Sequence, residues 1–265
     1  MATSSHRGRA RPDGAAGAND DQSAPSAALP ATANRLLRAL PSAAYDRIAP
    51  FLTRVKLGLK QTLYEPDATI THAYFPVDGC VSMVSTMEEG AVEVATVGNE
   101  GLVGIPLLHH TESTPSLVFV QVEGAAERIA AGDLLAVMRE SEPAERLFYR
   151  YAQALFDQVA QNTACNRLHS LEARCARWLL MTHDRVGMER GVNQFALTQE
   201  FLSYMLGVHR PAVTIAAGVL QDAGMIRYHR GTITVIDRAS LEGAACACYG
   251  IMHRGYEKLF DRASV

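Results

Sequence analysis

Residues 197–225, LTQEFLSYMLGVHRPAVTIAAGVLQDAGM, contain two segments of helical periodicity that are separated by Gly207. Glycine suits a tight turn, because a residue without a Cβ atom adopts backbone conformations that other residues resist. Pro211 follows almost at once, and proline costs little in the first turn of a helix, where N–H groups have no carbonyl partner. The stretch therefore predicts two helices joined by a short turn, which is a helix-turn-helix.

The composition of both segments favours close packing of the two predicted helices. Ser203, one turn before the glycine, is small enough to let the helices approach each other. Thr198 can cap the first helix through its side-chain oxygen. Apolar residues occupy the positions expected to face inward: Leu202, Leu206, Val208, Val213 and Ala216.

The outward side chains at the start of the second helix are those that can enter a DNA major groove. Arg210 can donate two hydrogen bonds to guanine O6 and N7. Arg230 lies in a turn, His229-Arg230-Gly231, between two short strand-like runs, where a wing could reach the DNA backbone or minor groove. We therefore predict DNA contacts for Thr198, Gln199, His209, Arg210, Pro211, Thr214, Ile215 and Arg230.

Length and composition are those of a globular protein: 265 residues, 48% hydrophobic and 20% charged, enough for about two domains. A net charge of −3 argues against a general polyanion binder but permits one small basic face. No apolar run reaches the ~18 residues of a membrane span, and the start lacks the apolar core of an export signal. An odd cysteine count in a chain of this length favours free thiols in a reducing, cytoplasmic compartment.

The N-terminal half predicts a β domain. Residues 1–33 are rich in Ala, Ser, Gly and Pro, and we expect a disordered tail there. Residues 81–98, VSMVSTMEEGAVEVATVG, predict a hairpin that turns at Glu88-Glu89-Gly90. Short strand-like runs with regular turns over about 55–130 favour an antiparallel sandwich or jelly roll.

From Pro143 onward the periodicity is helical, with Leu147, Tyr151, Leu155 and Val159 at a spacing of four. About 25 residues form a helix of ~37 Å, longer than a small sandwich needs to cover one face. Such a helix often pairs with its own copy in a dimer. Packing within the chain is the alternative.

This order of elements resembles the CRP/FNR family of bacterial regulators over residues 34–240. The resemblance is carried by the opening stretch, by the wing RYHRGTITV, and by the upstream segments YFPVDGCVSMV and VEVATVGNEGLVG. It implies an α+β chain with an N-terminal antiparallel β jelly roll of the cyclic-nucleotide-binding type, a long dimerisation helix and a C-terminal winged helix-turn-helix. It also implies a homodimer on a pseudo-palindromic site in double-stranded DNA, with RNA polymerase as a further candidate partner and no membrane association.

Five segments are expected from these arguments. They are a disordered tail (1–33), a β-roll sensor domain (34–142), a dimerisation helix (143–169), a winged helix-turn-helix domain (170–240) and a C-terminal helical extension (241–265).

The sequence departs from the nucleotide-responsive members of the family. Those members hold ribose with a glutamate after a glycine, and the cyclic phosphate with an arginine; here Ile105 and Pro106 follow Gly104, and the arginine position falls near Pro115. A buried phosphate without a cation is costly, so we predict that cyclic AMP is not the ligand. The predicted effector pocket, for an effector still unknown, comprises Gly101, Gly104, Ile105, Pro115 and Ser116.

Two further departures concern sensing and DNA reading. The iron–sulfur members use an N-terminal cysteine cluster, but no cysteine precedes Cys80. Of the family's arginine-glutamate…arginine reading set only the first arginine is kept, as Arg210, while Pro211 and Ile215 take the other two places. We therefore expect a different DNA sequence to be read.

Other candidate sites are weaker. Cys165 and His169 have a spacing that can chelate a metal, and Cys246 and Cys248 add two thiols, but free cysteine often packs as a small apolar residue, which we favour. The pair at 109–110, His-His, could ligate haem, and we favour a solvated pair. We predict no metal, no cofactor and no enzyme, since the common catalytic motifs are missing. A ligand- or metal-binding regulatory module whose winged helix contacts protein is the alternative function, motivated by the modest basicity of residues 198–236.

Overall fold

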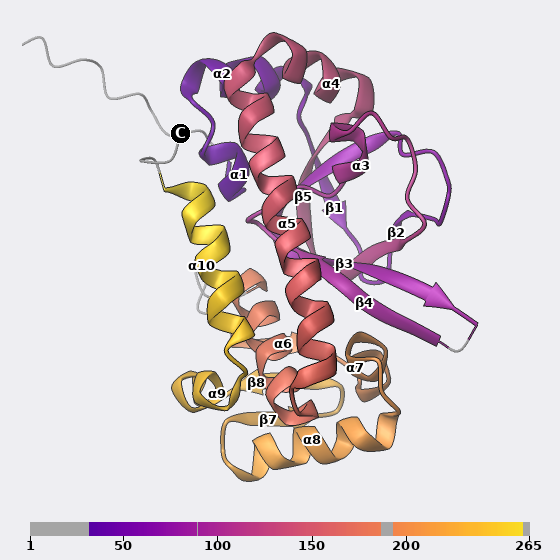
Figure 1. The fold of residues 1–265 in the computed structure, drawn as a ribbon, viewed down its shortest axis with the longest axis vertical. Helices are drawn as coiled ribbons and strands as arrows, with labels where there is room; N and C mark the ends of the chain where they lie inside the picture. The colour runs from indigo at the N-terminus through magenta and orange to yellow at the C-terminus, as the bar shows by residue number, and fades with distance from the viewer. Residues whose placement is uncertain (1–31, 89, 187–192, 262–265) are drawn as a thin grey trace, which may run out of the picture.

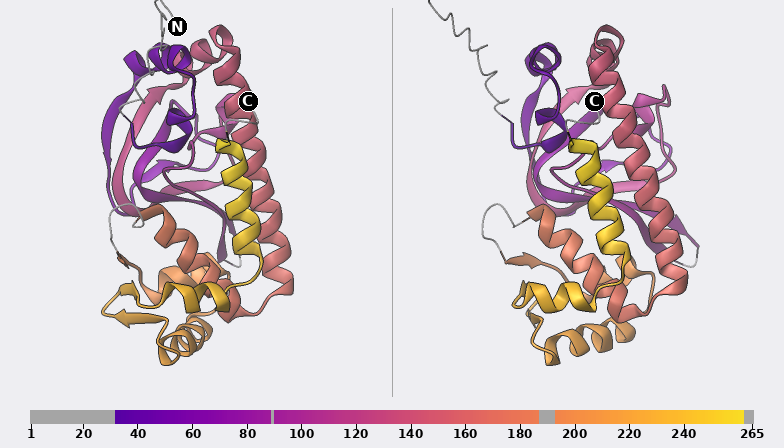
Figure 2. Two further views of the ribbon diagram at one scale, coloured as in Figure 1. Left: turned by 90° about the vertical axis from the view of Figure 1, so that its left-hand side faces the viewer. Right: turned by 60° about the vertical axis from the view of Figure 1, so that its left-hand side comes forward.

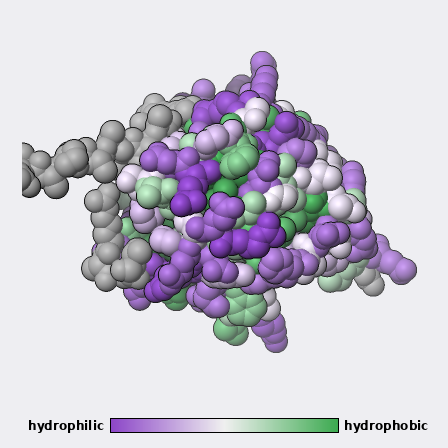
Figure 3. All heavy atoms as spheres, turned by 90° about the horizontal axis from the view of Figure 1, so that it is seen from above, coloured by the Kyte–Doolittle hydropathy of each residue, from purple (hydrophilic) through white to green (hydrophobic). Residues whose placement is uncertain are grey.

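The computed structural model describes residues 32–88, 90–186 and 193–261. A β-roll forms one end of the molecule and a small helical domain the other, while two helices, α5 and α10, run along one side of the roll (Figures 1 and 2). Within the described ranges, no helix combines the length and apolar composition that a membrane span requires. The end of the molecule seen from above in Figure 3 is mainly hydrophilic, with small hydrophobic patches in between.

The helices and strands follow in chain order. The N-terminal half contains α1 (Arg35–Arg38), α2 (Ser42–Ile48), η1 (Ala49–Phe51), β1 (Thr53–Leu57), β2 (Thr62–Tyr64), β3 (His72–Met87), β4 (Gly90–Val97), α3 (Ile105–Leu108), β5 (Leu117–Ala130) and α4 (Ala131–Glu140). The C-terminal half contains α5 (Glu142–Leu168), α6 (Leu171–Val186), β6 (Gln194–Ala196), α7 (Gln199–Leu206), α8 (Arg210–Asp222), β7 (Ile226–His229), β8 (Thr232–Val235), α9 (Arg238–Ala244) and α10 (Cys248–Phe260).

The β-roll is an antiparallel sheet with the order β1-β5-β3-β4, and β2 also pairs with β5. Register shifts in β3 near Pro76 and Cys80 let this long strand bend while it pairs with β5. The predicted hairpin is confirmed, with Met87 paired to Gly90 across the turn; Glu89 lies outside the described residues. Alternate side chains of these strands fill the core, including Phe75, Val81, Val97, Val120 and Ile129.

Residues 1–31 of the predicted tail lie outside the described residues, but the tail prediction is wrong for Thr32. Its side chain is buried, and its hydroxyl donates to Glu127 Oε2 at 2.8 Å. Asn34 Nδ2 donates to the carbonyls of Pro76 and Gly101, and its Oδ1 accepts from the Leu37 N–H. The segment that packs on the roll therefore begins at least as early as Thr32.

Helix α5 lies against the roll, and its predicted apolar face is covered within the chain. Tyr151 is fully buried and donates to the Leu102 carbonyl at 3.1 Å. A Cβ on Gly101 would overlap the Tyr151 hydroxyl, so this approach requires glycine. On the other flank, the Tyr256 hydroxyl of α10 donates to Gln158 Oε1 at 3.0 Å. The face marked by Leu147, Tyr151 and Leu155 thus packs inside the chain, so pairing with a second copy has to use another face of α5.

Helix α6 joins the roll to the helical domain through buried polar contacts. The Arg185 guanidinium contacts Glu100 Oε1 at 2.8 Å, with both side chains buried. Trp178 Nε1 donates to Glu93 Oε1 on β4 at 2.8 Å. Breaking one partner of such a buried pair leaves an unsatisfied polar group, which costs about 1–3 kcal/mol and more for a charge.

The other carboxyl oxygen of Glu93, Oε2, shares the Ser82 hydroxyl with a second acceptor. If Glu93 is ionised, the two acceptors have one hydrogen between them. The Ser82 hydroxyl lies 2.8 Å from both Glu93 Oε2 and Gln121 Oε1, yet it has one hydrogen to donate. A proton on Glu93 supplies the missing donor. Burial raises the pKa of Glu93 to about 7, although the hydrogen bonds from Ser82 and Trp178 lower it.

Stability should therefore fall as pH rises through the pKa of Glu93. The folded state holds a proton on this carboxyl between the unfolded pKa near 4.5 and the folded value near 7, so the stabilisation is complete below the lower value and lost above the upper one. From about pH 6 to about pH 8.5 the wild type should lose on the order of 1 kcal/mol more unfolding free energy than Glu93→Gln, measured by urea denaturation. Equal pH slopes for the two proteins would show that Glu93 does not titrate in this range.

Candidate DNA interface

The helix-turn-helix forms as predicted. Gly207 has a left-handed backbone (φ 63°, ψ 42°), and Val208 N–H donates to the Ser203 carbonyl at 3.0 Å, which closes the end of α7. The Thr198 hydroxyl oxygen accepts from the Phe201 N–H at 3.1 Å and caps the start of α7. Helix α8 begins at Arg210, so Pro211 lies in its first turn.

The inner faces of both helices pack on α6 and on the small sheet. The buried side chains come from the predicted positions Leu202, Leu206, Val213 and Ala216, together with Trp178 and Leu179 of α6, whereas Val208 is half-buried. Ser203 is buried where the helices approach, and its hydroxyl donates to the Glu200 carbonyl at 2.6 Å. This packing fixes α8 on the outside of the domain, farthest from the roll (Figure 1).

The outward end of α8 presents exposed side chains at each position predicted for it: His209, Arg210, Pro211, Thr214 and Ile215. Gln199 is half-buried, and its Oε1 accepts from the Thr214 hydroxyl at 2.9 Å. The contact joins the exposed ends of α7 and α8 and leaves the Gln199 amide donors unused by that bond. Periodicity alone could not indicate it, because the two residues lie on different helices.

The wing forms as predicted and is tied to the start of α7. Strands β6, β8 and β7 form an antiparallel sheet, and the β7–β8 turn places Arg230 (φ 48°) and Gly231 (φ 79°) in left-handed conformations, as in a two-residue hairpin of the primed type. The Leu197 N–H donates to the Gly231 carbonyl at 2.7 Å. Arg230 is exposed at the tip, and Thr198 is exposed beside it.

The β3–β4 hairpin of the roll contacts the turn that orients α8. A Cβ on Gly207 would lie 3.2 Å from Val92 Cγ2 of β4. Nearby, Phe119 of β5 meets Phe201 of α7 edge-on, with ring centroids 5.8 Å apart. A groove runs between the hairpin and the turn, and it reaches Arg210. A change in the hairpin can therefore reach α8 through direct contact.

The residues of the predicted effector pocket lie on two stretches of the roll, 101–105 and 115–116. Gly104 is buried, and a Cβ there would lie 3.1 Å from both Ala73 Cβ and the Tyr64 hydroxyl. Close packing of the roll therefore accounts for this glycine without a ligand. Ile105 is half-buried at the start of α3, and Pro115 is exposed in the loop before β5.

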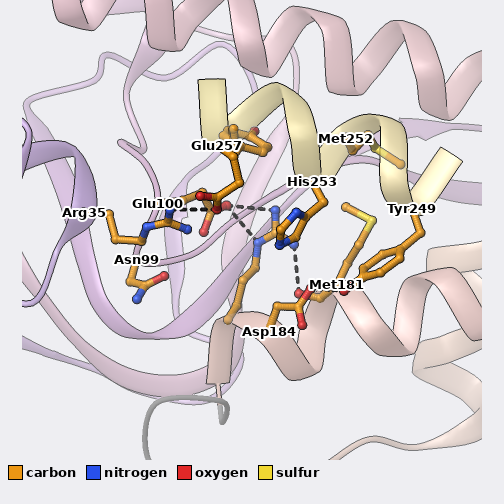
Figure 4. A pocket seen from close by; sticks show the side chains of 11 residues that line it. Arg35, Asn99, Glu100, Met181, Asp184, Tyr249, Met252, His253 and Glu257 are labelled. Carbon is orange, nitrogen blue, oxygen red and sulfur yellow. Dashed lines mark hydrogen bonds and ion pairs between the residues drawn. The ribbon is translucent and has the colours of Figure 1, made fainter. Parts of the chain in front are cut away.

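A cavity that no sequence motif indicates lies where α1, the loop after β4, α6 and α10 meet (Figure 4). Its volume is about 250 Å³, and its lining includes Arg35, Glu100, Arg185, His253 and Glu257. Ion pairs hold two of its arginines, with Arg35 2.8 Å from Glu257 and Arg185 2.8 Å from Glu100. Four segments far apart in the chain build this cavity, so no local pattern could have indicated it.

Comparisons with known proteins match both the helix-turn-helix sequence and the fold of the chain. Residues 173–244 match the family model of the Crp-like helix-turn-helix domain. The fold is similar to FixK2 of Bradyrhizobium japonicum (16% identity, 74% of this chain and 98% of that chain covered, TM-score 0.62). The fold is also similar to that of a CRP-family transcriptional regulator of Thermus thermophilus, TTHB099 (19% identity, 72% of this chain and 96% of that chain covered, TM-score 0.59). A third similar structure is the c-di-GMP-responsive regulator CLP of Xanthomonas campestris (15% identity, 74% of this chain and 99% of that chain covered, TM-score 0.57).

A comparison of the sequence with curated proteins found no significant match. At these identities the structural similarities establish the fold, and the sequence match establishes the C-terminal domain. Residues 173–244 therefore form a Crp-like helix-turn-helix domain, and the chain as a whole has the fold seen in regulators of the CRP/FNR type.

Proposed function

We propose that the protein is a dimeric, sequence-specific DNA-binding transcriptional regulator. The observation that carries the proposal is the exposed Arg210 at the N-terminal end of α8, held outward by the turn at Gly207. A recognition helix enters the major groove with its N-terminal residues, and a guanidinium there can form a two-bond pair with guanine. Thr198 and the wing residue Arg230 are exposed near each other, where the wing turn approaches the start of α7, and suit phosphate contacts.

Specificity would depend on few contacts in this protein. Residues 198–236 have a net charge of +1, so the electrostatic attraction to phosphates is modest. The Thr214 hydroxyl lies within hydrogen-bond distance of Gln199 Oε1 (2.9 Å) and of the Arg210 carbonyl (3.2 Å), so its one hydrogen is already used within the protein. It would offer DNA a hydroxyl oxygen next to the amide donors of Gln199. Loss of Arg210 should therefore weaken binding more than loss of an arginine that contacts only a phosphate, because the base hydrogen bonds are lost as well.

Arg210→Ala should weaken binding to the preferred DNA site by about 5- to 150-fold, which corresponds to the ~1–3 kcal/mol of one bidentate arginine–guanine pair. It should also relax the preference at one base pair of each half-site. Fluorescence anisotropy with the selected site and with single-base variants measures both effects.

Arg254→Ala is the matched control, because it removes the same charge from an exposed position on α10. It should bind as the wild type does. If Arg210→Ala binds all sequences as tightly as this control, Arg210 has no role in reading DNA.

We also propose that the two copies pair through the outer face of α5. Tyr149 and Phe156 are seven residues apart, which places them on one helix face, and Phe156 is 66% exposed. Apolar side chains at heptad spacing on a helix of 27 residues suit a two-stranded coiled coil.

Phe156→Glu should convert the dimer to a monomer, because two carboxylates would face each other across the helix pair. Light scattering after size exclusion measures the mass. Phe51→Glu, at an apolar side chain that is 44% exposed in η1, should remain a dimer. A dimeric Phe156→Glu protein would place the interface elsewhere.

Cyclic AMP is not the proposed effector. No arginine or lysine occurs from Gly104 to Phe119, where the family's phosphate-binding arginine would lie, and burial of a phosphate without a cation is costly. Millimolar cyclic AMP should therefore leave the melting temperature unchanged. A saturable rise in melting temperature would contradict this, because a ligand that binds the folded state must stabilise it.

The alternative function, a regulatory module whose winged helix contacts protein, is favoured by one observation. Ile215 and Val219 on the outer face of α8 are 66% and 49% exposed, and apolar side chains of this kind suit a protein surface. Ile215 can also contact a thymine methyl group, which makes it compatible with DNA. Binding of the wild type to selected DNA decides between the two functions.

A further inference from the structure

Four metal-binding side chains that the sequence separates come together at the junction of α5, α6 and α10. Cys165 lies in the last turn of α5 and His169 just after it, while Cys246 and Cys248 precede and begin α10. Their ligand atoms all lie within 4.8 Å of one another. Cys165 Sγ is 3.4 Å from Cys246 Sγ, and His169 Nδ1 is 3.5 Å from the sulfur atoms of Cys165 and Cys248.

We propose that these four residues bind one zinc ion, which fastens the C-terminal helix α10 to the end of α5. Three thiolates and an imidazole in a tetrahedral arrangement form a closed structural zinc site. With zinc–sulfur bonds of about 2.3 Å, the sulfur–sulfur edges of such a tetrahedron are about 3.8 Å. The separations in this cluster are close to that value, so small shifts of side chains would complete the coordination.

The surroundings of the cluster supply what a buried zinc–thiolate site needs. Three thiolates, a neutral imidazole and Zn²⁺ carry one net negative charge, and Arg174 and Arg177 of α6 are buried close enough for their charges to act on Cys165. The Nε atoms of both arginines lack a hydrogen-bond partner among the described residues. Buried cations with unused donors fit an anionic centre better than they fit neutral thiols.

A hydrogen bond from a neighbouring side chain reaches the sulfur atoms from another side. Gln161 Nε2, one turn before Cys165 on α5, donates to Cys248 Sγ at 3.0 Å. Hydrogen bonds of this kind orient metal ligands and hold thiolates in place.

The nature of the ligands selects zinc. Soft thiolates with imidazole in a tetrahedron suit zinc, whereas magnesium and calcium require oxygen ligands. A disulfide between Cys165 and Cys246 is the competing outcome, because their sulfur atoms are adjacent. A disulfide would leave Cys248 and His169 without a role, and a reducing compartment disfavours it.

The zinc site would hold together the end of α5, the start of α10 and the short link from α5 to α6. Helix α5 ends at Leu168 and α6 begins at Leu171, so the zinc ligands flank the link between the roll and the DNA interface. Met181 and Met252 pack beside the cysteines and also line the cavity of Figure 4. Metal binding would therefore order the wall of that cavity together with the junction.

The test is the metal content of the full chain, expressed with zinc and purified under reducing conditions without chelator. Mass spectrometry of the native protein and elemental analysis should find about one zinc per chain, as expected for four ligands around one ion. Removal of zinc and addition of Co²⁺ should produce the visible absorption of tetrahedral, thiolate-bound cobalt. A protein that takes up no stoichiometric zinc, a Cys165–Cys246 disulfide under the same conditions, or a cobalt spectrum without thiolate bands would each overturn the proposal.

Two ligand variants and one control assign the site. Cys246→Ser and His169→Gln should each weaken zinc binding by at least about tenfold in competition with a chromophoric chelator, since loss of a group that only hydrogen-bonds a metal ligand already costs about 10- to 100-fold. Cys175→Ala removes a buried cysteine of α6 outside the cluster and should keep wild-type zinc affinity. His169 is partly exposed, so its variant tests the site even if Cys246→Ser fails to fold. Equal zinc affinity in the control and in His169→Gln would contradict the assignment.

Discussion

The left-handed backbone at Gly207 determines where the outward end of α8 points, and the DNA contacts proposed for this helix depend on it. A side chain at this position would strain the backbone and would press on Val92 of the β3–β4 hairpin. The same residue thus sets the angle between two helices and permits the roll to contact the turn. Pro211 and the Thr198 cap support the geometry, because each suits the first turn of its own helix.

The roll and the helical domain are joined by buried polar contacts, and an effector could act through them. Glu93 of the roll accepts a hydrogen bond from the neutral indole N–H of Trp178 in α6. Glu100 of the roll forms an ion pair with Arg185 of the same helix. Such contacts are costly when one partner is lost, so they define a single arrangement of the two parts. A ligand can shift that arrangement only if it binds one state better than another, and the cavity at the junction is built from the same loop and helix.

Sequence reasoning predicted the features whose signals lie within a few residues. The turn at Gly207, the cap at Thr198 and the hairpin before Gly90 all depend on local backbone preferences. Periodicity identified the apolar face of α5, but could not tell whether the chain itself or a second copy covers it. The sequence favours packing for the cysteines, because a free thiol often behaves as a small apolar residue. Cys165 and Cys246 are 81 residues apart, and only the return of α10 along α5 brings them together.

Hydroxyl-radical footprinting of the full-length protein on DNA selected from genomic fragments is the most direct measurement of whether the exposed end of α8 reads DNA. Two recognition helices related by two-fold symmetry should protect two half-sites whose centres lie about 10 base pairs, or ~34 Å, apart on one face of the duplex. Absence of protection, or a single unsymmetrical protected stretch, would contradict the proposed role of the helix-turn-helix.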